Sequence, residues 1–449
     1  MKILTADHVL PITGDALERG AVAVDGERIA AVGPRAAIIE NYPAAPVEDF
    51  GAAAILPGFV NVHSHLEITA MRGFLDEFDA DFAAWLLTLT KTRAERLSDD
   101  DVQTAAVAGA VEGARAGVTC FGDIGRLGRH GFEALKRAGL RGIVFQETEF
   151  SPADRTADED FEKLREKFLA LREGETALVK TGLSPHSPYT VGPRLFQKIA
   201  EYAIETNVKI TIHAAESREE EEFMRAGTGF FAALYRKFGH EWNAPRCSSV
   251  EYLERLGVLR ARPLLAHCVT VSDRDLEIIK ETDSRVAHCP KSNAKFGHGI
   301  APFERFLDAG IRTGFGSDSV ASNNTCDILE EARFATVFAR SAADRQRFLH
   351  AREIVETATL GGARALGLDA EIGSLEAGKQ ADLAVVGLDD IAQLPVHDPY
   401  AALVFASNAR DVRLTMVAGR EIYRDGAVTT LDEPALKAKM RALARQIKT

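Results

Sequence analysis

The sequence lacks the features of several broad protein classes. No run of apolar residues is long enough to cross a membrane, and the first residues contain no apolar core followed by a small-residue cleavage site. No pair of cysteines has the CxxC spacing, and their number is odd: Cys120, Cys247, Cys268, Cys289 and Cys326. We therefore expect a cytoplasmic protein with reduced cysteines and without a signal peptide.

The sequence also lacks an excess of basic residues. Its 449 residues carry a formal net charge of −12, whereas a nucleic-acid site needs a basic patch. Hydrophobic residues make up 46% and charged residues 27%, which is ordinary for a globular protein. We expect neither nucleic acid nor a membrane as a partner, and a homo-oligomer is compatible with this composition.

Short apolar runs alternate with helical stretches through the middle of the chain. The expected strands cover residues 56–62, 118–122, 142–146, 177–183, 209–213, 263–267, 285–288 and 312–316. The helices expected between and after them include 161–172, 194–205, 219–237, 273–281, 327–340 and 351–366. Eight strands that alternate with helices predict an α/β protein with a parallel TIM (β/α)8 barrel, and an open doubly wound sheet is the structural alternative.

The two ends of the chain have a different pattern, rich in short β-type runs. Asp25-Gly26 lies between two alternating runs, which is typical of a hairpin. The segments at the two ends can pair in space as a small β-sandwich. We therefore predict three parts: a sandwich from 1–55 and 368–430, a barrel over 56–367, and a C-terminal helix over 431–449.

The pair His63 and His65 directly follows the first apolar run of the predicted barrel. Strand residues two apart point to the same side, so both imidazoles can bind one metal ion. Two solvent-facing loop histidines would give the same letters, so this motif alone does not decide between the two interpretations.

Five further polar residues follow the predicted strands where each strand meets its loop. They are His186, His213, His267, His288 and Asp318. In a TIM barrel this face carries the active site. A single histidine at a strand end is usually structural, but this many on one predicted face favour a metal site.

Three imidazoles and one carboxylate, from His63, His65, His213 and Asp318, would leave a position for water, as a catalytic metal requires. Water bound to such an ion loses a proton near neutral pH. Glu216 follows His213 by three residues and could move protons between that water and a leaving amine. The same spacing also suits a glutamate that merely begins a helix.

Several motifs together resemble a known family. In chain order they are PGFVNVHSHLE, MRG, GLSPHSPYTV, HAAE, AHCV, HCPKSNAKFG and GSDSVASNN, with GSLEAGKQADLAVV marking the return of the sandwich. This set resembles the amidohydrolase superfamily, in particular its cytosine/adenosine-type deaminases and triazine hydrolases, including the methylthioadenosine/S-adenosylhomocysteine deaminases. The resemblance covers nearly the whole chain.

The resemblance implies roles for individual residues. Metal ligands are implied at His63, His65, His213 and Asp318, a proton shuttle at Glu216, a hydrogen bond from His267 to the attacking water, and a substrate contact at His186. Asp318 would also help to deprotonate that water. Zinc is the expected ion, with iron as the alternative. The lysine that binuclear relatives use is missing from the end of the fourth strand, since Lys180 lies at its start, so one ion is expected.

Several further residues are candidates for contact with the substrate. Glu67 and Trp85 lie in a long first loop, where Trp85 could stack on a heteroaromatic ring or simply pack a rim helix. Glu67 could accept a hydrogen bond from substrate, or pair with Arg72 or another nearby cation. Ser292, Asn293 and His298 could bind a substrate edge or brace their loop. Candidate anchoring arginines are Arg126, Arg129 and Arg218.

Three functions follow from this pattern. The first is hydrolytic deamination of an amino-substituted nitrogen heterocycle, such as an adenine nucleoside (methylthioadenosine, S-adenosylhomocysteine, adenosine or aminodeoxyfutalosine) or a related free base. The second is dechlorination of a triazine or opening of a cyclic amide or imidazolone at the same site. The third is a metal-free scaffold protein, which the presence of every candidate ligand disfavours. Retention of Glu216 favours deamination, because the leaving amine needs a proton.

Overall fold

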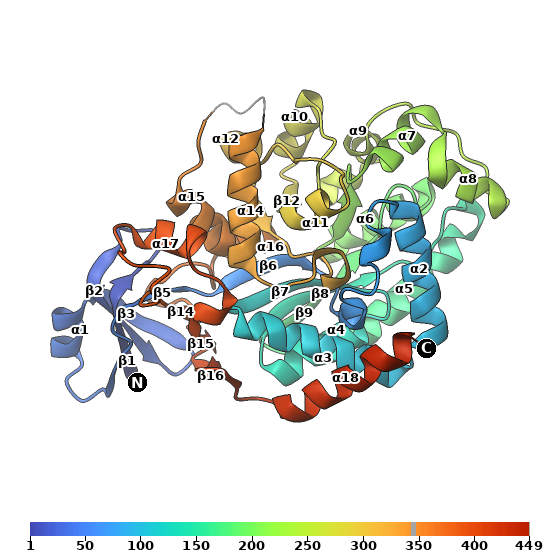
Figure 1. Cartoon of the computed structure of the whole chain (residues 1–449). Coiled ribbons are helices and arrows are strands. Elements are labelled where there is room, and N and C mark those ends of the chain that lie inside the picture. The colour runs from blue at the N-terminus through green and yellow to red at the C-terminus, as the bar shows by residue number, and fades with distance from the viewer. Residues whose placement is uncertain (343–346, 449) are drawn as a thin grey trace.

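The computed structural model describes residues 1–342 and 347–448 (Figure 1). Its centre is built from parallel strands in two four-stranded sheets, of order β6-β7-β8-β9 and β10-β11-β12-β13. These strands are β6 (Phe59–Ser64), β7 (Val118–Gly125), β8 (Arg141–Glu147), β9 (Val179–Ser184), β10 (Thr211–Ala214), β11 (Leu264–His267), β12 (Arg285–His288) and β13 (Thr313–Phe315). Every predicted strand of the middle region overlaps one of them, so the predicted α/β class is confirmed.

The two four-stranded sheets meet along both of their outer edges. A parallel bridge pairs Leu183 with Ile210 beside β9 and β10, and another pairs Ser64 with Asp318 beside β6 and β13. At the second edge the amide of Asp318 donates to the carbonyl of His63 at 2.9 Å. The carboxyl ends of the first and last strands are thus adjacent, and they bring residues 255 positions apart into contact.

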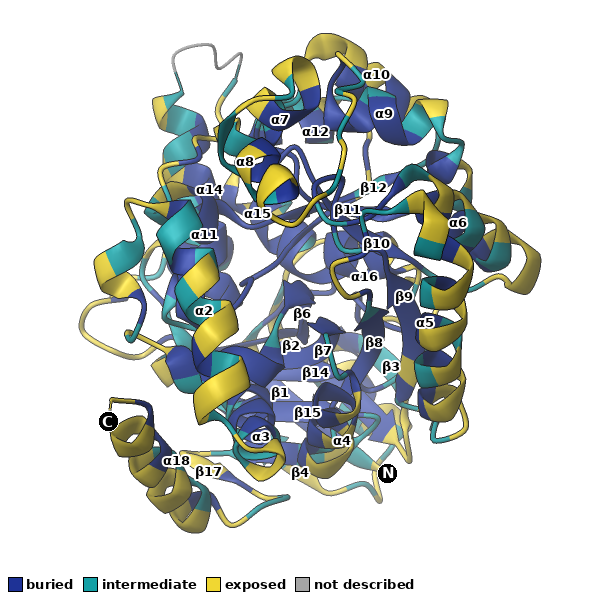
Figure 2. Ribbon diagram, turned by 90° about the vertical axis from the view of Figure 1, so that its right-hand side faces the viewer, coloured by how far each residue is buried: buried dark blue, intermediate teal, exposed yellow. Residues whose placement is uncertain are grey.

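Helices cover the outside of these strands. In Figure 2 the strands are buried, and partly exposed helices surround them. In chain order they are α2 (Phe82–Arg96), α3 (Asp99–Arg115), α4 (Arg129–Ala138), α5 (Ala157–Arg172), α6 (Pro193–Thr206), α7 (Arg218–Ala226), α8 (Gly229–Lys237), α9 (Ser249–Arg255), α10 (Asp273–Glu281), α11 (Pro290–Lys295), α12 (Phe303–Asp308), α13 (Val320–Asn323), α14 (Ile328–Ser341), α15 (Ala351–Glu356) and α16 (Gly362–Leu366). Ser98 and Asp101 cap α3 reciprocally. In the described part of the chain, no helix has both the length and the apolar content needed to cross a membrane.

The remaining strands form a third sheet beside the first two. It has nine strands, in the order β17-β16-β15-β14-β5-β1-β2-β3, with β4 paired to β1. Their bounds are β1 (Lys2–Val9), β2 (Leu17–Asp25), β3 (Arg28–Pro34), β4 (Val47–Asp49), β5 (Ala53–Pro57), β14 (Leu383–Gly387), β15 (Val412–Val417), β16 (Arg420–Arg424) and β17 (Ala427–Val428). Helices α1 (Arg35–Asn41) and α17 (Pro399–Phe405) accompany them, and α18 (Glu433–Lys448) ends the described chain. The predicted pairing of the two chain ends is observed between β5 and β14, while the sandwich arrangement stays a prediction.

Two predicted elements are wrong in their extent. The expected strand 56–62 is divided between β5, which belongs to the nine-stranded sheet, and β6. The chain changes sheet at Gly58, where an added Cβ would lie 2.1 Å from the side chain of Thr119. The helix expected over 219–237 is two helices, because Gly227 ends α7 with a left-handed φ of 70°.

A buried ion pair joins the two parts of the molecule. Arg141 at the start of β8 donates from Nε and Nη2 to the two carboxylate oxygens of Asp382, at 2.7 and 3.1 Å. The side chains are only 9% and 1% exposed, and the amide of Ala418 also donates to Asp382. The bidentate geometry and the extra donor compensate for the loss of water around both charges.

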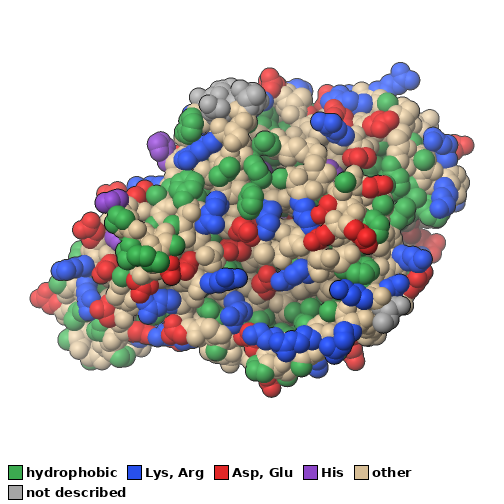
Figure 3. All heavy atoms as spheres, viewed as in Figure 1, with side chains coloured by type: hydrophobic (Ala, Val, Ile, Leu, Met, Phe, Trp, Pro, Cys, Tyr) green, Lys and Arg blue, Asp and Glu red, His purple; other side chains and the backbone are tan. Residues whose placement is uncertain are grey.

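We expect Arg141→Ala to lower the free energy of unfolding by about 3–5 kcal/mol, because it leaves the Asp382 carboxylate buried without its counter-charge. Urea unfolding followed by circular dichroism measures the effect. Arg165→Ala is the matched control, since the side chains of Arg165 and Glu162 are 42% and 49% exposed and such surface pairs contribute at most about 1 kcal/mol. Exposed acidic and basic side chains like these two are interspersed over the face of the molecule that Figure 3 shows. Equal effects of the two variants would contradict this role for the buried pair.

Candidate metal centre and active site

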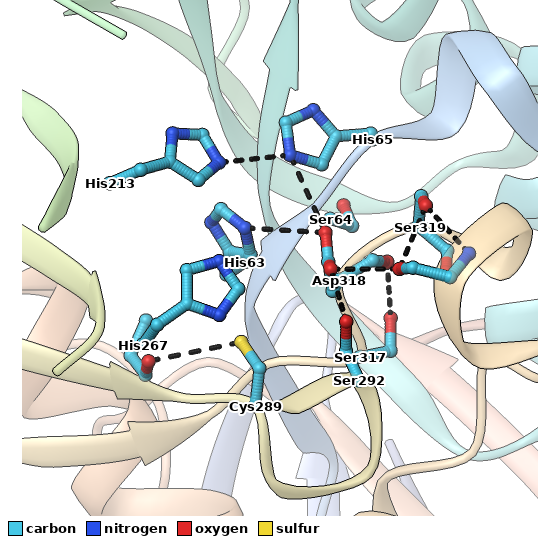
Figure 4. A network of polar contacts seen from close by, with 12 residues as sticks. His63, Ser64, His65, His213, His267, Cys289, Ser292, Ser317, Asp318 and Ser319 are labelled. Atoms are coloured by element: carbon cyan, nitrogen blue, oxygen red, sulfur yellow. Dashed lines mark hydrogen bonds and ion pairs between the residues drawn. The ribbon is translucent and has the colours of Figure 1, made fainter. Parts of the chain in front are cut away.

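Three histidines converge at the carboxyl ends of β6 and β10 (Figure 4). Each of His63, His65 and His213 offers one ring nitrogen, and these three atoms lie within 4.8 Å of one another. Nε2 of His65 is 3.3 Å from Nε2 of His213. The predicted convergence of the HxH pair with the histidine of a distant strand is therefore present in the structure.

Asp318 lies on the other side of this cluster. Its Oδ1 is 3.5 Å from Nε2 of both His63 and His65. Its Oδ2 accepts hydrogen bonds from the hydroxyls of Ser292 and Ser322, at 2.6 and 2.8 Å. Burial alone would raise the pKa of Asp318, but its close approach to His63 and to the other nearby histidines holds that pKa well below its usual range. The Asp318 carboxylate is thus an anion: the two hydroxyls hold its Oδ2, and its Oδ1 faces the imidazoles.

The donor set fits a divalent cation. His63 is fully buried, and neither of its ring nitrogens has a hydrogen-bond partner among the described residues. An unsatisfied buried polar atom costs about 1–3 kcal/mol, so such atoms mark an interaction that the polypeptide alone does not supply. Burial also lowers the pKa of His63 and of His213, and that of His65 to about 3, which keeps all three rings neutral as metal ligands must be.

Glu216 lies in the turn after β10 and is 6% exposed. Its Oε1 is 3.7 Å from Nε2 of His267 and 3.8 Å from Nε2 of His298, and its Oε2 accepts a hydrogen bond from the Tyr189 hydroxyl at 3.4 Å. Burial raises the pKa of Glu216 to about 8, and the Asp318 carboxylate adds to the effect. A cation bound beside Asp318 would lower that pKa, because positive charge favours the carboxylate.

The turn that carries Glu216 is held by a second buried glutamate. The carboxylate of Glu220 accepts hydrogen bonds from the amides of Ala215 and Glu216, at 2.8 and 2.9 Å, and from the hydroxyl of Ser249. These bonds hold Ala215 at a left-handed φ of 54°. The Glu216 side chain is thereby directed toward the histidines and not into the following helix, α7.

His267 is oriented by its neighbour on the next loop. Its Nδ1 lies 2.8 Å from Oδ1 of Asn293, to which it donates. This bond places the proton of a neutral His267 on Nδ1 and leaves Nε2, which faces Glu216, as an acceptor. Asn293 was predicted as a candidate substrate contact, and the structure places it behind His267.

A cavity of about 390 Å³ opens onto these residues. Its lining includes His65, His213, Glu216, His267 and Asp318. The lining also includes six aromatic side chains, mainly from α2, α8 and the end of α11: Phe82, Trp85, Phe230, Phe231, Phe238 and Phe296. Trp85 is 5% exposed and packs edge-on against Phe296 at 4.9 Å between ring centroids. The cavity therefore combines a polar centre with aromatic side chains, which suits an aromatic heterocycle.

The cavity also has a polar end near β7, β8 and β9, with Glu67, Arg93, Glu147 and His186 in its wall. Glu67 accepts a hydrogen bond from the Leu127 amide at 3.2 Å, and burial raises its pKa. The alternative pairing of Glu67 with Arg72 is not present, because Arg72 pairs with Glu112. Nδ1 of His186 contacts the hydroxyls of Ser187 and Thr190, both at 2.9 Å.

Some predicted candidates lie away from the cavity wall. Ser292 bonds Asp318, and His288 stacks on Phe303 with 4.9 Å between ring centroids. Arg129 pairs with Asp99, whereas Arg126 does line the cavity. Lys180, at the start of β9, lies 3.6 Å from Glu175 and outside the cavity wall, as expected for a site that lacks a lysine ligand. The roles predicted for Ser292 and Asn293 as substrate contacts stay predictions.

Sequence reasoning missed three residues of this site: Arg93, Glu147 and Tyr189. Glu147 ends β8, so the rule that drew attention to the other strand-end residues would have found it. Arg93 lies on α2 among exposed charged residues and gives no sequence signal of its own. Tyr189 lies within the motif GLSPHSPYTV, where nothing in the sequence distinguishes it as a site residue.

Comparisons with known proteins identify the family of the chain. A sequence profile described as "Amidohydrolase family" matches residues 54–422. A protein of Moorella thermoacetica named 5-methylthioadenosine/S-adenosylhomocysteine deaminase is 32% identical over 448 residues, 98% of each chain.

Solved structures are similar over nearly the full length. An adenosine deaminase from Xanthomonas campestris with bound zinc has a TM-score of 0.87 and 28% identity, covering 99% of this chain and 98% of that one. An atrazine chlorohydrolase from Arthrobacter aurescens complexed with zinc has a TM-score of 0.85 and 24% identity, covering 99% and 100%, which is a likeness of fold. The chain belongs to the amidohydrolase family.

Proposed function

We propose that the protein is a metal-dependent hydrolytic deaminase that releases ammonia from an amino-substituted nitrogen heterocycle, with an adenine-type nucleoside as the substrate class. The observation that carries this proposal is the buried carboxyl of Glu216 between the histidine cluster and an aromatic-walled cavity. The names of full-length relatives at about one third identity support the same reaction class. The two four-stranded sheets would form one closed (β/α)8 barrel, with the nine-stranded sheet folded as a sandwich beside it.

One divalent cation would be held by His63, His65, His213 and Asp318. Zinc is the first choice, since the adenosine deaminase of similar fold contains it, and iron is the alternative. When bound, such an ion supplies a water molecule whose pKa is lowered to near neutrality.

The remaining steps belong to side chains of this chain. Glu216 would take one proton from the attacking water and pass it to a ring nitrogen. It would then carry the second proton of that water, from the hydroxyl now bound to the ring carbon, to the leaving amine, so that a carbonyl forms and ammonia departs. Nε2 of His267 accepts a hydrogen bond from that water and orients it. Asp318 is an anion whose Oδ1 lies 3.5 Å from Nε2 of both His63 and His65, so it would favour loss of the water's proton.

An assay for ammonia release tests the proposal. The panel contains adenosine, methylthioadenosine, S-adenosylhomocysteine, aminodeoxyfutalosine, free purines, cytosine and a chlorinated triazine. We expect ammonia from at least one adenine nucleoside. Chloride release from the triazine without ammonia from any nucleoside would instead support the dechlorination alternative.

Asn293→Ala is expected to lower kcat by about 10- to 100-fold, because His267 loses the acceptor that fixes its ring orientation. KM and metal content should change little, since Asn293 reaches neither the cavity wall nor the histidine cluster. Steady-state kinetics with the best substrate of the panel measure the effect. Asn41→Ala, at an exposed position of α1, is the control; a normal kcat for Asn293→Ala would contradict the positioning role.

A further inference from the structure

Glu147 lies at the end of β8 and lines the cavity. Among the described residues, it is the one carboxylate at the end of a strand in the cavity wall that the deamination chemistry does not use. Its side chain is 12% exposed, and its Oε1 is buried without a hydrogen-bond partner among the described residues. Glu147 lines the same cavity as Glu216 and is close to His186 and His213. A buried acceptor that faces a cavity and has no partner in the polypeptide indicates a donor on the ligand.

A second metal ion does not explain this acceptor. Glu147, His186 and His213 do form a group with ligand atoms within 4.8 Å. His213, however, already belongs to the cluster with His63 and His65: its Nε2 lies 3.3 Å from Nε2 of His65, and its Nδ1 contacts the carbonyl of His186 at 3.1 Å. Neither nitrogen of His213 is left for a second ion.

The distance between Glu147 and His186 suits a single hydroxyl group. Oε1 of Glu147 and Nε2 of His186 are 3.9 Å apart, which is too far for a direct hydrogen bond. Two hydrogen bonds of about 2.8 Å that meet near a right angle at one oxygen span about 4 Å. A hydroxyl placed there would donate to the carboxylate and accept from the imidazole, whose other nitrogen is already engaged by Ser187 and Thr190.

Charge at this end of the cavity favours a neutral group over an anion. Arg93 and Glu147 are each other's strongest charged neighbour, and Glu67 lies near the same pair. Arg126 lies 4.0 Å from Glu149. A phosphate or carboxylate beside Glu147 would meet the like charge of that carboxylate and of Glu67.

We propose that Glu147 and His186 together bind one sugar hydroxyl of the substrate, so that the enzyme selects a hydroxylated nucleoside over the corresponding deoxynucleoside and free base. This inference rests on the proposed deaminase function and adds a specificity residue to it. The two side chains come from neighbouring strands, since Glu147 ends β8 and His186 follows the end of β9.

The test compares adenosine, 2′-deoxyadenosine, 3′-deoxyadenosine and adenine as substrates of the metal-loaded wild type, Glu147→Gln and Glu147→Ala. For the wild type we expect kcat/KM for adenosine to exceed that for one of the two deoxynucleosides by about 10- to 100-fold. Glu147→Ala should lose about that factor with adenosine, and Glu147→Gln a smaller one, because its amide oxygen still accepts a hydrogen bond but without the negative charge. For both variants, kcat/KM for that deoxynucleoside and for adenine should stay within about twofold of wild type. Glu162→Gln, on the exposed face of α5, is the matched control.

Two results would overturn the inference. One is equal kcat/KM for adenosine and both deoxynucleosides in the wild type. The other is an equal loss on all four compounds in both Glu147 variants, which would mean that Glu147 supports the metal site or the fold. If the wild type releases no ammonia from any of them, the proposed function fails, and calorimetric binding of the same compounds tests the inference separately. Equal or absent binding of adenosine and its deoxy analogues would then overturn it as well.

Discussion

Glu216→Gln is expected to abolish most of the turnover while the protein keeps its metal. A glutamine has the size of the glutamate but cannot take up and release a proton, and general acid–base groups contribute about 10²- to 10⁴-fold. We therefore expect kcat for ammonia release to fall by that factor. The ligand side chains do not include Glu216, so metal content measured by elemental analysis should match the wild type.

The matched control for this variant is Glu221→Gln. Glu221 lies in the first turn of α7, five residues along the chain, where its side chain is 40% exposed and pairs with Arg225. It should behave as wild type. Normal turnover by Glu216→Gln would show that another group moves the proton, and loss of metal by the same variant would show that Glu216 is a ligand.

Removal of a metal ligand is expected to have the second large effect. His65→Ala deletes one of the three converging imidazoles, and Asp318→Asn removes the only carboxylate of the set. Changes behind metal ligands already cost about 10- to 100-fold in metal affinity, so loss of a ligand should cost more than about 100-fold. Both variants should be purified with little metal and should release little ammonia.

Retained folding distinguishes this effect from general damage. His65→Ala removes a ring that is 17% exposed at the cavity, so its thermal unfolding in the presence of a chelator should resemble that of the chelated wild type. His397→Ala, at an exposed position, is the control for the loss of a histidine. Full metal content in His65→Ala would contradict the assignment of this residue as a ligand.

Much of the fold follows from local patterns in the sequence. The eight central strands are short, apolar and bounded by helices with clear starts, such as the α3 helix that Ser98 and three aspartates begin. The convergence of His63, His213 and Asp318 was predictable because parallel strands place their carboxyl ends on one face. The predicted membership of the amidohydrolase superfamily is confirmed by the profile match and by the relatives.

The contacts between loops were not predictable in the same way. Ser292 and Asn293 have polar side chains of the kind that bind substrates. The fold of the segment after β12 instead places them in hydrogen-bond contact with Asp318 and His267. The nearness of Arg93 on α2 to Glu147 at the end of β8 is not encoded by any periodicity in either segment. The change of sheet at Gly58 interrupts a continuous apolar run, so a pattern of hydrophobicity alone could not place it.

The central claim is that side chains from distant strand ends form one centre around one metal ion. The most direct measurement removes the metal with a chelator, adds zinc back in known amounts, and follows ammonia release from the best nucleoside substrate. We expect the chelated protein to be inactive and activity to rise in proportion to zinc until one ion is bound per chain. Full activity of a preparation shown by elemental analysis to be free of metal would contradict the account.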